Sequence, residues 1–187
     1  MWQRIALRNI HYSDRHRRLD ALYRMPDPWE METERERFRF QETNRLIYRN
    51  IGRPVRLLEV GCGEGHQSQE LLKTCDRLVG IDVSRRAVQR SAERCPHATF
   101  RVGDVLSCNP LERFDLVVAC EVLYYMQDVA SAIERISDLG QWCLVTYFDV
   151  HADRLDPYLE GIPEVKSDRF HYGDTGWKAF WWRNANI

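Results

Sequence analysis

The sequence of 187 residues has no long apolar run, no excess of charge of one sign and only three lysines, at positions 73, 166 and 178. A transmembrane helix needs about 20 consecutive apolar residues, and residues 1–24 mix arginine with polar side chains instead of forming an apolar signal-peptide core. We therefore expect a cytoplasmic protein without a membrane partner. With 27 Lys and Arg against 28 Asp and Glu, nothing in the charge favours nucleic acid as a partner.

The sequence also has no C-x-x-C pair and no His/Cys cluster with the ligand spacing of a zinc site. Several cysteines lie in apolar runs, where a thiol behaves as a small buried side chain. The sequence therefore predicts reduced cysteines and no bound metal. The cysteines are Cys62, Cys75, Cys95, Cys108, Cys120 and Cys143.

Repeats and low-complexity stretches are missing as well, and the length suits one domain spanning residues 1–187. Its first part, residues 1–50, is expected to be a leader followed by a helix from residue 33 to 50. Pro26 and Pro28 stop any regular helix before that point. We expect this segment to act as a lid.

The second part, residues 55–148, alternates between strand-like and helix-like segments, which predicts right-handed βαβ crossovers and a parallel sheet with helices on both faces. Residues 149–187 follow with a helix near 151–160 and two strand-like runs around a Gly-Asp-Thr-Gly turn, which predict a closing hairpin. The sequence thus predicts a mostly parallel, seven-stranded α/β sheet with an antiparallel C-terminal edge. The strand-like segments of the second part are 56–60, 77–81, 99–102, 114–119 and 142–148, and the helical ones are 64–74, 84–94 and 128–138.

The strongest motif is the Gly-rich turn Glu-Val-Gly-Cys-Gly-Glu-Gly-His at residues 59–66, between the first strand and a helix. Glycines allow a tight turn and the close approach of a ligand. A dinucleotide fingerprint reads G-x-G-x-x-G, whereas the third glycine here, Gly65, comes one residue earlier. A pyrophosphate would also lie beside Glu59 and Glu64. The motif therefore argues against a dinucleotide, and on its own it is also compatible with a merely tight turn.

Acidic residues follow three of the other strands. Asp82 ends the second strand, where a carboxylate can accept both ribose hydroxyls. Its alternative role would be to cap the next helix, but Ser84 is the better N-cap. Asp104 follows the third strand, and Glu121 follows the fourth, with Tyr124 just beyond it. The carboxyl ends of parallel strands meet at one edge, so these side chains are expected to line one crevice.

Together these motifs resemble the class I S-adenosylmethionine-dependent methyltransferases, and within them the nodulation protein S-like group. The resemblance covers about residues 25–148 and implies a Rossmann-like methyltransferase fold with S-adenosylmethionine as cofactor and S-adenosylhomocysteine as product. It is carried by Asp27-Pro-Trp29, Glu36-x-x-Arg39-Phe40, Leu58–Cys62, Cys75–Ser84, Phe114–Val117 and Glu121–Tyr125.

The resemblance also implies which residues bind the cofactor. The Gly-rich turn holds the methionine part, Asp82 the ribose, and Asp104 with the next backbone N–H the adenine. Arg39 would bind the cofactor carboxylate, and the Trp29 side chain would form part of the wall of the cofactor pocket. Two alternatives stay open: Trp29 as a packing residue, and Arg39 on a solvent-exposed helix face. The implied contacts are Trp29, Arg39, Glu59, Gly61, Cys62, Gly63, His66, Asp82, Val83, Asp104, Val105 and Glu121.

For the reaction, Glu121 and Tyr124 are the candidate catalytic residues, because an amine must be neutral to attack and either residue could orient it or remove its proton. The nodulation proteins methylate an amine on a chitooligosaccharide, which favours N-methylation of a small polar, sugar-like or oligosaccharide acceptor. O-methylation and a non-catalytic nucleoside-binding module are the alternatives. A nicotinamide-dependent oxidoreductase is disfavoured because no lysine forms a Tyr-x-x-x-Lys pair, and a nucleic-acid methyltransferase because Asn-Pro-Pro-Tyr is missing after the fourth strand.

Overall fold

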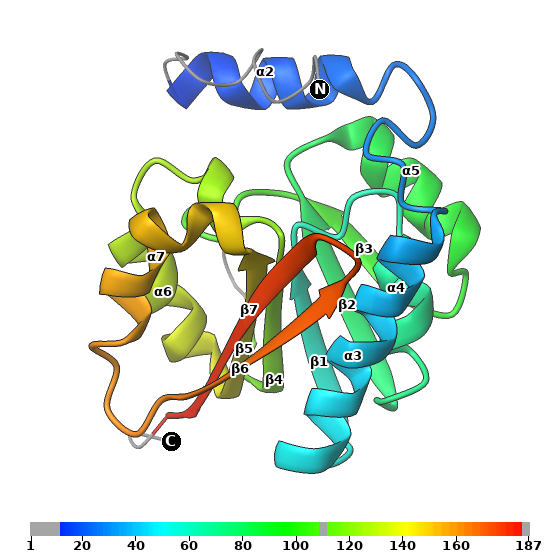
Figure 1. Cartoon of the computed structure of the whole chain (residues 1–187). Coiled ribbons are helices and arrows are strands. Elements are labelled where there is room, and N and C mark those ends of the chain that lie inside the picture. The colour runs from blue at the N-terminus through cyan, green and yellow to red at the C-terminus, as the bar shows by residue number, and fades with distance from the viewer. Residues whose placement is uncertain (1–11, 109–111, 185–187) are drawn as a thin grey trace.

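A seven-stranded sheet forms the centre of the computed structural model, which describes residues 12–108 and 112–184. The strand order is β3-β2-β1-β4-β5-β7-β6 (Figure 1). Strands β1 to β5 pair in parallel, and β7 runs antiparallel to both β5 and β6. The predicted Rossmann-like sheet with an antiparallel C-terminal edge is confirmed. The strands are β1 (Arg56–Val60), β2 (Arg77–Asp82), β3 (Thr99–Val102), β4 (Phe114–Cys120), β5 (Gly140–Phe148), β6 (Lys166–Tyr172) and β7 (Thr175–Arg183).

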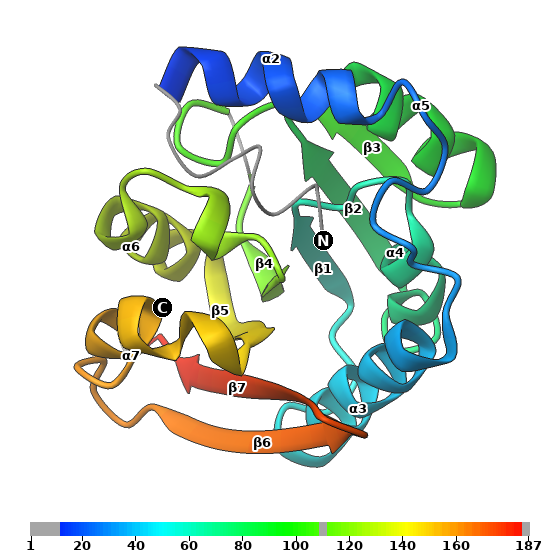
Figure 2. The same ribbon diagram turned by 45° about the horizontal axis from the view of Figure 1, so that its top comes forward.

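Helices cover both faces of the sheet, with α3, α4 and α5 on one face and α6 and α7 on the other (Figure 2). Helix α2 lies across the edge at which the parallel strands end (Figures 1 and 2). No helix in the described part of the chain is long and apolar enough to cross a membrane. The helices are α2 (Tyr12–Leu22), α3 (Glu34–Asn50), α4 (His66–Leu71), α5 (Arg85–Arg94), α6 (Val129–Leu139) and α7 (Ala152–Leu159), with 3-10 turns η1 (Leu123–Tyr125) and η2 (Asp149–His151).

The apolar core is split in two by the sheet, because successive side chains of a strand point to opposite faces. In β4, Val117 and Ala119 join the core beneath α6 and α7, whereas Leu116 and Val118 join the core beneath α3 and α4. Both sets are fully buried. A strand covered on both faces must be apolar throughout, which is why β4 reads as an unbroken apolar run.

Local signals in the sequence place most element boundaries correctly. Ser84 caps α5 as predicted, accepting the N–H of Ala87 at 3.2 Å. Helix α4 is shorter than predicted, because Gly65 is left-handed and residues 72–74 form a tighter turn. The hairpin turn holds two residues instead of four, since Thr175 already pairs with Tyr172.

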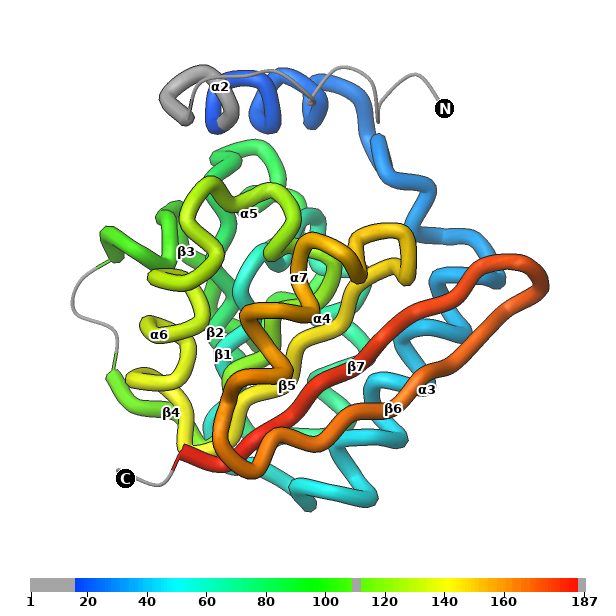
Figure 3. Tube along the Cα trace, turned by 60° about the vertical axis from the view of Figure 1, so that its left-hand side comes forward, coloured from blue at the N-terminus to red at the C-terminus, as the bar shows by residue number. Residues whose placement is uncertain are grey.

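The hairpin of β6 and β7 extends the sheet beneath α3 and packs against this helix (Figure 3). Phe38 of α3 lies 6.3 Å from Phe170 and 5.5 Å from Tyr172 between ring centroids. The Tyr172 hydroxyl donates to Glu34 at 3.1 Å. These contacts fix the start of α3 beside the end of β6.

Candidate active site

The Gly-rich turn directly after β1 brings the backbone unusually close to its neighbours. Gly61 has a φ of +75°, and a Cβ atom there would lie 2.6 Å from Val122, so only glycine lets this turn pack against the loop after β4. Gly63 has a φ of +53°, and a Cβ there would lie 3.0 Å from the Tyr23 hydroxyl. The turn therefore meets both the loop after β4 and the N-terminal segment.

The carboxyl of Glu59 lies under this turn and is 3% exposed. The Ser68 hydroxyl at the start of α4 donates to it. Burial raises the pKa of Glu59 to about 8, although Ser68 and Arg39 act in the opposite direction. Burial also raises the pKa of the Cys62 thiol well above its usual value, so this cysteine stays neutral.

Asp82, at the end of β2, lies next to the Gly-rich turn as predicted. Its Oδ2 accepts the N–H of Gly63 and its Oδ1 accepts the N–H of Ser84, both at 2.9 Å. Burial raises the pKa of Asp82, and these two N–H donors oppose the rise. Val83 is half-buried between the strand end and the cap. The carboxylate thus fixes the turn after β1 relative to the start of α5.

Asp104, after β3, lies at the same edge and closes its own turn by accepting the N–H of Leu106 at 2.9 Å. Its other carboxyl oxygen lies 3.3 Å from His16 of α2. The Val105 side chain is buried in the core beneath α6, and its carbonyl accepts from Arg135. The structure therefore places the Val105 side chain in the core and the Asp104 carboxyl between its own turn and α2.

Glu121 follows β4 in a left-handed conformation with a φ of +56°, which is uncommon for a residue other than glycine. Its Oε1 accepts the Thr146 hydroxyl at 3.2 Å, and its Oε2 accepts the Phe148 N–H at 3.1 Å. The Tyr124 hydroxyl also donates to Oε2 at 3.3 Å. Burial raises the pKa of Glu121 to about 7, with Arg39 lowering it. A buried carboxyl that titrates near neutrality can exchange a proton with a reactant.

Aromatic rings form a row beside Glu121. The Tyr124 ring stacks on His151 of η2 with 4.0 Å between centroids, and Tyr125 lies 4.5 Å from Tyr124. Trp29 continues the row at 5.6 Å from Tyr125, and its Nε1 donates to the Tyr23 hydroxyl at 3.1 Å. Tyr23 and His151 are additions to the predicted site, and no sequence pattern marks either of them.

Arg39 is buried, which corrects the alternative that placed it on a solvent-exposed helix face. The residue is 1% exposed. Its Nε donates to Glu36 and its Nη1 donates to Gln67, both at 2.7 Å, and its Nη2 lies 3.8 Å from the sulfur of Met31. A guanidinium this far from water must be paired and hydrogen-bonded, and Glu36 supplies the countercharge.

The segment before α3 is held by contacts to the elements at the carboxyl edge of the sheet. Asp20 of α2 accepts the Ser84 hydroxyl at 2.8 Å and pairs with Arg86. Further along, the Asp27 N–H donates to Glu64 in the Gly-rich turn at 2.8 Å. Arg90 of α5 pairs with Glu64 and also donates to the Met25 carbonyl. The N-terminal segment is therefore held by the elements that carry the candidate site.

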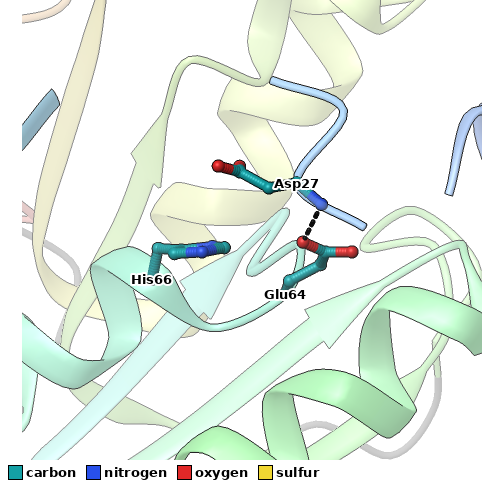
Figure 4. Close-up of side chains that lie close together, drawn as sticks. All are labelled: Asp27, Glu64 and His66. Carbon is teal, nitrogen blue, oxygen red and sulfur yellow. Dashed lines mark hydrogen bonds between the residues drawn. The ribbon is translucent and has the colours of Figure 1, made fainter. Parts of the chain in front are cut away.

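Asp27, Glu64 and His66 are of residue types that could hold a metal ion, and one N or O atom of each lies within 4.8 Å of the others (Figure 4). Both carboxyls already have donors in the chain: Glu64 has Arg90 and the Asp27 N–H, and Asp27 accepts the N–H of Met31 at 2.7 Å. Burial and Arg94 lower the pKa of His66, which favours the neutral ring. The sequence spacing gave no hint of this group.

A protein-family model described as Nodulation protein S (NodS) matches residues 13–143 of the chain. Nodulation protein S of Sinorhizobium fredii is 36% identical over 128 residues, which cover 66% of this chain and 57% of that protein. Nodulation protein S of Bradyrhizobium diazoefficiens is 32% identical over 130 residues, with 67% and 62% covered. The chain thus spans about three fifths of the length of these curated relatives.

Among solved structures, the chain is similar to the N-methyltransferase NodS from Bradyrhizobium japonicum WM9 in complex with S-adenosylhomocysteine. The TM-score is 0.78 at 26% identity, with 91% of this chain and 98% of that chain covered. The structural similarity therefore covers more of the chain than the sequence resemblance, which spans about residues 25–148.

Proposed function

Because the chain belongs to the nodulation protein S family, we propose that it is an S-adenosylmethionine-dependent methyltransferase acting on an amine of a small polar or oligosaccharide acceptor. The observation that carries the proposal is the gathering of the Gly-rich turn, Asp82 and Glu121 at one edge of the sheet. The first two suit a nucleoside cofactor, and the third is a buried carboxyl that titrates near neutrality.

The residues at this edge fit the cofactor. Gly61 and Gly63 present bare backbone after β1, and each oxygen of Asp82 keeps a lone pair for a ribose hydroxyl beside the N–H that it accepts. Asp104 and the Val105 N–H would hold the adenine. The S-adenosylhomocysteine in the NodS structure supports S-adenosylmethionine as the cofactor. Bound there, S-adenosylmethionine supplies an electrophilic methyl group on a sulfonium. The other predicted cofactor contacts are Glu59, Cys62 and His66 of the turn, and Val83 after β2.

Glu121 would take the proton that the amine sheds as its nitrogen gains the methyl group. A carboxyl with a pKa of about 7 is matched to an amine proton at neutral pH. It is a weak base toward a hydroxyl, whose proton is far less acidic, and this favours nitrogen over oxygen as acceptor. Tyr124 would hold the Glu121 carboxyl through its hydroxyl and present its ring to the acceptor.

The N-terminal segment would serve as a lid. Methyl transfer needs alignment of the reactants and exclusion of water. Trp29 lies against Tyr125, and Tyr23 lies against Gly63, so the segment covers both the acceptor side and the cofactor side of the crevice. Among the described residues, Arg39 meets this segment only at the sulfur of Met31, and its other hydrogen-bond partners are Glu36 and Gln67.

The test is a turnover assay with S-adenosylmethionine and matched pairs of amino-sugars and their hydroxyl analogues. Mass spectrometry of the product then locates the transferred methyl. We expect S-adenosylhomocysteine to be released and the methyl to be on nitrogen. A methyl on oxygen would overturn the acceptor assignment alone. Cofactor binding with no turnover on any acceptor would favour a non-catalytic nucleoside-binding module.

A further inference from the structure

Helix α7 holds the η1 turn, which carries Tyr124, through the guanidinium of Arg154. The Nη1 atom of Arg154 donates to the carbonyl of Tyr124 at 2.9 Å, and its Nη2 atom donates to the carbonyl of Met126 at 2.7 Å. These two carbonyls flank Tyr125, whose ring lies against Trp29. One arginine therefore binds the backbone on both sides of the residue through which η1 contacts the N-terminal segment.

The same end of α7 also contacts the Tyr124 side chain. His151 comes three positions before Arg154, in the turn η2 that leads directly into α7, and residues three positions apart in a helix lie on one face. The His151 ring stacks on the Tyr124 ring with 4.0 Å between centroids. Tyr124 is thus held by its ring and by its carbonyl from one turn of helix, and its hydroxyl donates to Glu121 at 3.3 Å.

Helix α7 can support η1 because it is itself fixed to the sheet. Its Leu155 side chain is fully buried in the core beneath the helix. The next residue, Asp156, pairs with Lys178 of β7 and accepts the hydroxyl of Tyr147 of β5 at 2.5 Å. Tyr147 and Lys178 are directly opposite each other in the pairing of β5 with β7. The contacts of Arg154 therefore connect η1 to the two strands beneath α7.

We propose that Arg154 is a positioning residue for the methyl transfer: by binding the carbonyls of Tyr124 and Met126, it holds η1 where the Tyr124 hydroxyl meets the Glu121 carboxyl. This inference rests on the proposed roles of Glu121 and Tyr124 in the reaction. A guanidinium suits the task, because its donors form a planar fork that can bind two acceptors and its charge does not change with pH.

Arg53 offers a matched control at the opposite edge of the sheet. Like Arg154 it is exposed, and its Nη1 and Nη2 atoms donate to the carbonyls of Lys73 and Cys75 at 3.0 and 3.1 Å. Arg53 precedes β1, and the loop that it binds leads into β2, so it acts at the amino ends of the strands. Arg53→Ala therefore removes a comparable pair of hydrogen bonds away from the candidate site.

The structural test is an NMR measurement of the His151 ring, whose signals are shifted by the stacked Tyr124 ring and are assigned by their loss in His151→Gln. In Arg154→Ala, these signals should move toward the values of an unstacked imidazole, because η1 is no longer held. Arg154→Lys, whose ammonium can still bind one of the carbonyls, should move them less, and Arg53→Ala should leave them unchanged. His151 signals at their wild-type positions in Arg154→Ala would overturn the proposal.

Activity gives the second readout, with the amino-sugar that the turnover assay identifies as the best acceptor. Arg154→Ala should lower kcat/KM for this acceptor by about 10- to 100-fold, since a misplacement of ~1 Å in a reacting group can cost about 10²-fold in rate. Calorimetry should find the affinity for S-adenosylhomocysteine unchanged, because Asp82 keeps its contacts to the Gly-rich turn and to α5. Arg53→Ala should keep both values of the wild type.

Wild-type kcat/KM in Arg154→Ala would overturn the positioning role. So would an equal loss in Arg53→Ala, or a matching loss of cofactor affinity, because either would mean that the whole fold has loosened. Circular dichroism checks folding, and if Arg154→Ala does not fold, Arg154→Lys is measured in its place and should shift both readouts in the same direction. Turnover absent in the wild type would count against the proposed function, and the His151 signals would still decide whether Arg154 holds Tyr124.

Discussion

The Tyr124 hydroxyl donates to Oε2 of Glu121 at 3.3 Å, which joins the two candidate catalytic side chains into one hydrogen-bonded pair at the end of β4. Both members are fixed from outside the pair. Glu121 is held by two donors from β5, and the Tyr124 ring is stacked on His151. Because these partners lie on β5 and η2, the fold itself holds the pair in a fixed arrangement.

Replacing Glu121 with Gln should slow methyl transfer by about 10²- to 10⁴-fold, the usual contribution of a general base. The amide keeps the size of the side chain but cannot take the amine proton. Tyr124→Phe, which keeps the stacked ring and removes the hydroxyl, should cost about 10- to 150-fold, the worth of one hydrogen bond to a charged group. Single-turnover rates check both. A Glu121→Gln variant as fast as the wild type would remove Glu121 from the mechanism.

Replacing Asp82 with Ala should weaken S-adenosylmethionine binding by at least about 1–3 kcal/mol, because the ribose hydroxyls lose their acceptor and the Gly63 N–H loses its partner. Asp82→Asn keeps one acceptor oxygen and should lose less. Isothermal titration calorimetry measures both. Wild-type affinity in Asp82→Ala would disprove the ribose assignment, and comparable binding of nicotinamide dinucleotides would disprove the cofactor class.

Stability should fall as the pH rises toward 8, because of Glu59. Burial raises its pKa from 4.5 to about 8, so the folded chain keeps a proton that the unfolded chain releases in that interval. The stabilisation is complete below about pH 4.5 and is lost as the pH rises through about 8. Glu59→Gln should flatten the profile measured by urea unfolding between these values, whereas Glu93→Gln on the surface should not. Equal slopes in both variants would contradict the buried, protonated carboxyl.

A chain that starts at Thr33 should fold but bind the cofactor poorly, because it lacks the segment that covers the Gly-rich turn. Trp29→Ala in the full chain tests the acceptor side separately and should raise the KM for the acceptor more than the Kd for S-adenosylmethionine. Calorimetry and steady-state kinetics give the two numbers. Unchanged cofactor affinity in the shortened chain would reduce the segment to a packing role.

Activity should survive exhaustive chelation. The carboxyls of Asp27 and Glu64 are already engaged by N–H donors and by Arg90, so a divalent cation would have to compete with contacts that the chain makes itself. Turnover that disappears in chelator and returns with one added metal would place an ion in the mechanism. A shift of the His66 NMR signals on adding that metal would locate the ion at this group.

Local patterns in the sequence predict the parts of the molecule that depend on neighbours along the chain. The apolar run of β4, the cap at Ser84 and the Gly-rich turn after β1 each follow from residues within a few positions of one another. Because parallel strands end at one edge, Asp82, Asp104 and Glu121 could also be placed together. The length of α4 and the two-residue hairpin turn were missed, because both depend on which residue leaves the regular conformation first.

The sequence by itself therefore determined the sheet, its two buried faces and the identity of the acids at its edge. Only the tertiary structure decided how those acids are held and charged. In the sequence, Arg39 is one of several arginines of the predicted helix. The structure shows that its guanidinium donates a hydrogen bond to Gln67, 28 positions away. Asp27 and Glu64, 37 positions apart, are joined by a hydrogen bond, and the Tyr124 ring stacks on His151 in η2, which follows β5. The spacing of apolar residues shows which face of an element is buried. The pKa of Glu121 depends instead on its burial and on the charge of Arg39 in α3, and no local pattern encodes either.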